Sequence, residues 1–126
     1  MKKSILIVSI LSLLHSSTFA FDHITSVKEF EEVTKKGNVI VDFYASWCEP
    51  CKEMSTNLQA LHAHNKTVKI YKVDIMKSPD VVAKYGTPQV PALLYMHDGK
   101  ILDGFIGLKS ITQLKKDIKS YFFSKK

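Results

Sequence analysis

The 126-residue chain is long enough for one domain, and a composition of 45% hydrophobic and 10% aromatic residues can build a single ordinary core. Its 18 basic residues outnumber its 12 acidic ones, but all of the basic residues are lysines, and they are scattered along the chain. Because nucleic-acid-binding surfaces gather arginine and lysine side chains, this pattern argues against nucleic-acid binding and is typical of a solvated surface.

The first 20 residues have the order of a secretory signal peptide. Two lysines follow the initial methionine, an apolar run extends from Ile5 to Leu14, and small and polar residues lead to Ala20. The apolar run is about ten residues long, whereas a membrane-spanning helix needs about twenty. We therefore expect residues 1–20 to be a signal peptide removed after Ala20, residues 21–126 to form the mature domain, and the protein to be periplasmic. An uncleaved segment that anchors the protein to the membrane is the alternative.

The first elements of the mature domain are predicted to be a helix and a buried strand. Thr25 and Ser26 can cap a helix, Glu29 completes a capping-box pattern, and Gly37 ends the helix. Residues 39–44 form a nearly continuous run of apolar, β-branched and aromatic residues around one aspartate. This run predicts a central strand that is buried on both faces.

The middle of the chain alternates between helical and strand patterns. The apolar spacing predicts a helix beginning near Cys51 and a strand over residues 68–75. A short helix follows, with Ser78 as its cap, Pro79 at its first position and Gly86 beyond its end.

The last third of the chain predicts a hairpin and a final helix. The hairpin covers residues 91–106 with its turn at 97–100, and Ser110 with Gln113 forms a capping box before an amphipathic helix that reaches Phe122. Because strands alternate with helices before the hairpin, we expect an α/β fold. Its central mixed sheet has four to five strands and is flanked by helices on both faces.

The two cysteines, Cys48 and Cys51, enclose only Glu49 and Pro50. A disulfide across such a short loop stabilises the fold little, so reactivity explains the pair better. The pair lies where a buried strand gives way to a helix, and free backbone N–H groups and the helix dipole favour a thiolate there. We therefore predict thiol–disulfide exchange, with Cys48 as the nucleophile and Cys51, which we expect to be more shielded, as the resolving thiol.

The residues between and after the cysteines are predicted to tune the redox balance. The Glu49 carboxylate disfavours a neighbouring thiolate and tilts the pair toward the disulfide, which makes it a better reductant. Lys52 acts in the opposite direction, and Pro50 stiffens the turn. A reductant of protein disulfides is the favoured function. The alternatives are an oxidase or isomerase of disulfides and a non-catalytic binding module.

The segment from Val41 to Lys52, Val-Asp-Phe-Tyr-Ala-Ser-Trp-Cys-Glu-Pro-Cys-Lys, resembles the active-site segment of the thioredoxin family. The similarity extends over almost the whole mature chain, through Tyr85-Gly86, Val90-Pro91, Asp98-Gly99-Lys100 and Ile106-Gly107.

The resemblance implies roles for five further residues. Pro91 matches a cis proline that faces the redox pair, and Val90 before it would present backbone groups to a substrate. Trp47 matches a tryptophan that shields the active site. Asp42 matches a buried proton acceptor beneath the resolving cysteine, and Lys72 matches its buried partner lysine.

The burial expected for Asp42 supports part of this assignment. A carboxylate in an apolar interior must pair or take up a proton, and a raised pKa suits a proton acceptor for Cys51. A purely structural pairing of Asp42 with Lys72 is the alternative, and Trp47 could also be a core residue.

Three departures from the family pattern alter the substrate-binding rim. Glu49 replaces the usual glycine, residues 87–89 differ from the usual stretch before the cis proline, and Ala92 replaces a common threonine. The Cys-Glu-Pro-Cys sequence also resembles exported thioredoxin-like proteins that reduce apocytochromes during cytochrome c maturation. The interval from Cys51 to Pro91 leaves no room for the insertion usual in those relatives, or for that of periplasmic disulfide-forming oxidases.

The remaining expectations concern partners and metals. The resemblance implies a monomer without a cofactor that acts on disulfide-bearing proteins and receives electrons from a membrane thiol transporter. A zinc site is disfavoured because His62 and His64 are expected on the far side of a helix from Cys48. Haem attachment needs a histidine after the second cysteine, where Lys52 stands.

Overall fold

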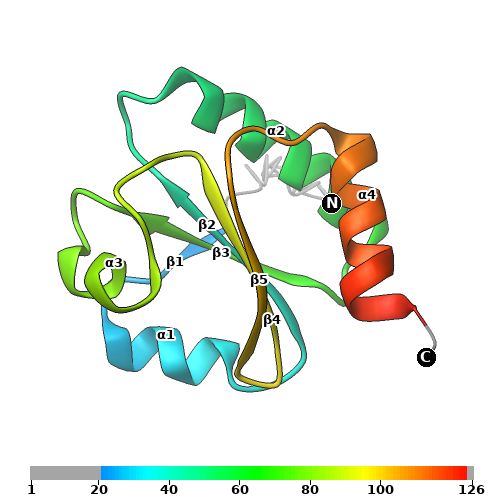
Figure 1. The fold of residues 1–126 in the computed structure, drawn as a ribbon, viewed down its shortest axis with the longest axis horizontal. Helices are drawn as coiled ribbons and strands as arrows, with labels where there is room; N and C mark the ends of the chain where they lie inside the picture. Colours follow the sequence, from blue (N-terminus) through cyan, green and yellow to red (C-terminus); the bar gives the residue numbers. More distant parts are fainter. Residues whose placement is uncertain (1–20, 125–126) are drawn as a thin grey trace, which may run out of the picture.

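The computed structural model describes residues 21–124, and a single mixed sheet of five strands runs through them (Figure 1). The strand order is β1-β3-β2-β4-β5, with β1 and β2 parallel to β3, β4 antiparallel to β2, and β5 antiparallel to β4. The strands are β1 Asp22–His23, β2 Asn38–Tyr44, β3 Lys69–Asp74, β4 Ala92–His97 and β5 Lys100–Ile106. The expected mixed sheet is confirmed, while the predicted signal peptide lies outside the described residues.

Helices cover both faces of the sheet. The pair α1 and α3 lies on one face and the pair α2 and α4 on the other (Figure 1). The helices are α1 Val27–Thr34, α2 Glu49–His64, α3 Pro79–Tyr85 and α4 Ile111–Ile118, and a π-helical turn, η1 Lys119–Phe123, continues α4. None of the helices within residues 21–124 is long and apolar enough to cross a membrane.

Strand β2 contributes to two separate hydrophobic clusters, as its continuous apolar pattern predicted. Val39, Val41 and Phe43 pack in the cluster beneath α1 and α3, while Ile40 packs in the cluster beneath α2 and α4. Because side chains alternate along a strand, Asp42 shares a face with Ile40. The aspartate therefore points toward the α2 side of the sheet.

The capping predictions are confirmed in full at α4, in part at α1 and wrong at α3. Ser110 and Gln113 form the complete capping box. The Ser26 hydroxyl caps α1 by accepting from the Glu29 N–H at 3.1 Å, but the Glu29 carboxylate accepts from the Thr25 N–H and hydroxyl instead of completing the box with Ser26. The Ser78 hydroxyl does not cap α3 but donates to the Ile24 carbonyl at 3.3 Å. Ser78 is buried. Its hydrogen bond to Ile24, a residue distant in the chain, replaces the expected hydrogen bond to the first turn of α3.

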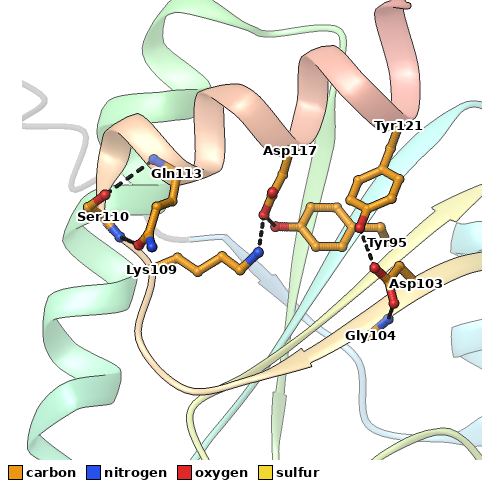
Figure 2. Close-up of polar contacts among 8 residues, drawn as sticks. All are labelled: Tyr95, Asp103, Gly104, Lys109, Ser110, Gln113, Asp117 and Tyr121. Carbon is orange, nitrogen blue, oxygen red and sulfur yellow. Dashed lines mark hydrogen bonds and ion pairs between the residues drawn. The ribbon is translucent and has the colours of Figure 1, made fainter.

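A polar cluster fixes the C-terminal helix to the sheet (Figure 2). Asp117 on α4 accepts from the Tyr95 hydroxyl at 2.5 Å and forms an ion pair with Lys109. The Tyr121 hydroxyl donates to Asp103 on β5. Together with the packing of Tyr121 and Phe122 on the core, these contacts hold α4 over the sheet, on the face that carries α2.

Candidate active site

Cys48 and Cys51 are joined by a disulfide at the start of α2, with their Cα atoms 5.3 Å apart. Cys48 is the N-cap of the helix, and its sulfur accepts from the Cys51 N–H at 3.3 Å. The sulfur thus occupies the position that a capping oxygen takes in other helices. The predicted placement at a strand-to-helix junction is confirmed, and a thiolate at this position receives a backbone N–H.

The two cysteines are shielded from solvent to the same extent. Cys48 is 4% exposed and Cys51 is 3% exposed, so the expected greater shielding of Cys51 is not found in the disulfide form. Ala45 forms a cluster with the pair, and Tyr44, Ile75 and Val90 pack against this cluster. The assignment of Cys48 as nucleophile therefore rests on its place at the helix N-terminus and not on exposure.

The charges beside the redox pair are matched. The Lys52 ammonium lies 2.8 Å from a Glu49 carboxylate oxygen, and both side chains are largely exposed. Since the two charges oppose each other and water screens both, their combined effect on the neighbouring sulfur is small. Pro50 lies in the first turn of α2, where the lack of an N–H leaves no hydrogen bond unmade.

The residues assigned to the substrate surface lie beside the pair. The Val90–Pro91 peptide bond is cis, as the resemblance implied, and Val90 packs against the cluster that contains both cysteines. The Pro91 carbonyl accepts from the Gly107 N–H at 2.8 Å, which ties the start of β4 to the end of β5. The side chain of Trp47 is 66% exposed, so its reading as a core residue is wrong.

Asp42 is a completely buried acid without a hydrogen-bond partner. It is 0% exposed, and neither carboxyl oxygen receives a hydrogen bond. Its register neighbour on β3 is Lys72, whose ammonium lies 4.0 Å from Oδ2. Burial raises the pKa of Asp42 from 3.8 to about 7, against the opposing charge of Lys72. The carboxyl therefore gains and loses its proton near neutral pH.

The structure adds two residues that the sequence reasoning missed, Ser55 and Tyr44. The Lys72 ammonium donates to the Ser55 hydroxyl at 3.1 Å and lies 4.4 Å from the centroid of the Tyr44 ring. A cavity of about 300 Å³ is lined by these three residues and by Cys51. Ser55 follows Cys51 by one helical turn, but this spacing alone does not indicate a contact with Lys72, which lies 17 residues away in the chain.

Within residues 21–124, no three His, Cys, Asp or Glu side chains are grouped as metal ligands. His62, which the sequence disfavours as a zinc ligand, contacts the Val68 carbonyl through Nδ1 at 3.0 Å.

Comparisons with known proteins agree with this geometry. The family model described as Thioredoxin matches residues 22–120. Thioredoxin of Chlamydia trachomatis is 37% identical over 98 residues, which cover 78% of this chain and 96% of that protein. Thioredoxin of Listeria monocytogenes is 31% identical over 93 residues, which cover 73% and 90%.

A solved structure is also similar to this chain. Oxidized mitochondrial thioredoxin 3 of Saccharomyces cerevisiae superposes with a TM-score of 0.74 at 32% identity, over 79% of this chain and 94% of that one. The shared fold, the coverage of nearly the whole length of these relatives and the disulfide at the start of α2 support the same conclusion. The chain belongs to the thioredoxin family and is a thiol–disulfide oxidoreductase, a protein-disulfide reductase with Cys48 and Cys51 as its redox centre.

Proposed function

We propose that the protein reduces disulfides of exported proteins in the periplasm and is itself reduced by a membrane thiol transporter. The observation that carries the thiol–disulfide exchange is the Cys48 sulfur at the N-cap of α2, which accepts a hydrogen bond from the Cys51 N–H in a cluster against which Val90 packs. The reductive direction is supported by the relatives, which are thioredoxins. The signal-like order of residues 1–20 supports export.

The reaction begins with reduced Cys48 as a thiolate. Its sulfur attacks one sulfur of the substrate disulfide, a Cys48–substrate bond forms, and the other substrate sulfur leaves as a thiolate. Cys51 then loses its proton and attacks the Cys48 sulfur, which forms the Cys48–Cys51 disulfide and releases the second substrate thiolate. The substrate has gained two electrons, and the protein is left in the disulfide form seen in the structure.

Asp42 is the proton acceptor for Cys51 in this scheme. A general base works best when its pKa lies near the working pH, and the pKa of about 7 for Asp42 meets that condition. The cavity is lined by Cys51 and by Lys72, whose ammonium lies 4.0 Å from the Asp42 carboxyl, so it reaches two of the groups in this scheme although the acid itself is buried.

The exposed ring of Trp47 and the Val90–Pro91 segment form the surface on which a substrate strand lies. The Glu49 side chain is exposed at the start of α2 and adds a carboxylate close to this surface. The Cys-Glu-Pro-Cys sequence supports apocytochromes as one candidate class of substrate.

Trapping of the mixed disulfide tests the proposal. Cys51→Ser removes the resolving thiol, so a substrate attached to Cys48 stays bound and can be identified after expression in the native host. The matched control carries Cys48→Ser as well and cannot form the bond. Exported disulfide-bearing proteins and a membrane thiol donor are the expected partners. Capture of cytoplasmic proteins only, or of none, contradicts the proposal.

Two further measurements test the direction of electron flow and the location of the protein separately. A redox potential near about −270 mV supports a reductant, whereas one near about −120 mV identifies an oxidant. N-terminal sequencing of the protein recovered from the periplasm should begin at Phe21, and absence of the protein from that compartment contradicts export.

A further inference from the structure

We propose that Ser55 is a positioning residue of the redox site, whose hydroxyl holds the Lys72 ammonium short of a hydrogen bond with Asp42. The inference rests on the proposed role of Asp42 as proton acceptor. It gives Ser55 a function that neither the family resemblance nor the cysteine motif assigns.

The contacts of Lys72 carry the argument. Its ammonium is within hydrogen-bond distance of Ser55, at 3.1 Å, but 4.0 Å from the nearer oxygen of Asp42. The face of the Tyr44 ring lies 4.4 Å from the same nitrogen. Both carboxyl oxygens of Asp42 remain without a hydrogen bond although a cation is near them. The ammonium is therefore held between Ser55 and the ring instead of closing on the acid.

The distance between the two charges determines whether Asp42 can act as a base. A direct hydrogen bond from an ammonium favours the ionised carboxylate and lowers its pKa strongly. At 4.0 Å the Lys72 charge opposes the effect of burial only in part, and the pKa of Asp42 stays at about 7. Closure of the pair would make Asp42 a weaker base for the proton of Cys51 and would ionise it at lower pH.

The fold brings these groups to one place from three elements. Helix α2 carries both Cys51, which must lose a proton, and Ser55 one turn later, while β2 and β3 carry Asp42 and Lys72 side by side. Other charged or titratable groups surround the pair. They are Lys52 on the cavity wall, Asp74 and His23 near the Tyr44 hydroxyl, and Tyr44 itself.

Titration of the oxidised protein tests the inference directly. Cys48 and Cys51 hold no titratable proton in the disulfide form, so the carboxyl ¹³C shift of Asp42 can be followed across the pH range. Ser55→Ala should lower the Asp42 pKa by about one unit, because the released ammonium approaches the carboxylate. Ser55→Thr keeps the hydroxyl and should restore the original value.

Thr56→Ala is the matched control. It removes a hydroxyl from the next residue of the same helix, but one that donates to the Lys52 carbonyl at 3.2 Å, so the Asp42 titration should not move. An unchanged or raised Asp42 pKa in Ser55→Ala overturns the inference, and so does an equal shift in Thr56→Ala.

A kinetic measurement distinguishes this inference from the proposed role of Asp42. The rate at which Cys51 resolves a preformed Cys48 mixed disulfide should lose its acid limb in Asp42→Asn. In Ser55→Ala the limb should move to lower pH by the same shift as the titration. If Asp42→Asn leaves the profile unchanged, the proton-acceptor role fails. The ¹³C titration still decides whether Ser55 sets the Lys72–Asp42 pairing.

Discussion

Replacement of Asp42 by asparagine is expected to stabilise the oxidised protein at alkaline pH. The carboxyl is completely buried, receives no hydrogen bond and lies 4.0 Å from Lys72, so its ionised form is poorly solvated in the fold. Asparagine has nearly the same shape and carries no charge. The substitution therefore removes the cost of burying the ionised carboxylate while it keeps the packing.

The pKa values set the size and the pH range of the effect. At pH values between 3.8, the pKa of Asp42 in the unfolded chain, and about 7, its pKa in the fold, the folded protein binds more protons at this carboxyl than the unfolded protein does. Stability therefore falls as pH rises through this window and stays low above it. A difference of about three units is worth about 4 kcal/mol at pH 8, whereas at pH 4 the contribution is below about 1 kcal/mol.

Urea unfolding of both proteins at pH 4 and pH 8 measures the difference. The gain in unfolding free energy from Asp42→Asn should be several-fold larger at pH 8 than at pH 4. Asp74→Asn is the control, since Asp74 is also buried but one of its oxygens accepts from the Met76 N–H at 3.0 Å. An Asp42→Asn gain that is equal at the two pH values, or a loss at pH 8, refutes the reasoning.

Three other substitutions probe features away from the buried acid. Gly86→Ala places a Cβ 2.6 Å from the Phe43 ring and should lower thermal and urea stability by about 1–3 kcal/mol. Ser110→Ala removes the N-cap of α4 and should cost about 1 kcal/mol in the same unfolding assays. Glu49→Gln leaves the Lys52 charge unmatched near Cys48. It should lower the pH midpoint of Cys48 alkylation by about half a unit or less, and a midpoint that rises contradicts this account.

The features that the sequence revealed are those encoded by local patterns. The continuous apolar run of β2 required burial on both faces, and the change from this run to a helical spacing placed the redox pair at the junction with α2. The Ser110 and Gln113 box was readable because both partners lie within one helical turn. Each of these signals involves residues close together in the chain.

Features that depend on contacts between distant segments were not readable. Strand β1 has only two residues, too few to show a period, and exists because it pairs with β3. Ser78 carried a capping signal, but its hydroxyl bonds to Ile24 from a distant part of the chain. Cys48 and Cys51 are shielded to a similar extent in a cluster against which Ile75 and Val90 pack, and these two residues come from segments outside α2. Ser55 contacts Lys72 only because the fold packs α2 against β3.

The geometry around Asp42 also bears on why the chain keeps an acid there. If its purpose were a structural ion pair with Lys72, the two groups should meet at hydrogen-bond distance, because a buried pair offsets its desolvation only with close contact. They stand 4.0 Å apart, and the ammonium bonds Ser55 instead. The 4.0 Å separation therefore suits a structural ion pair poorly, whereas the pKa of about 7 suits a proton acceptor. The loss of stability at neutral and alkaline pH follows from the same property that lets the carboxyl accept a proton.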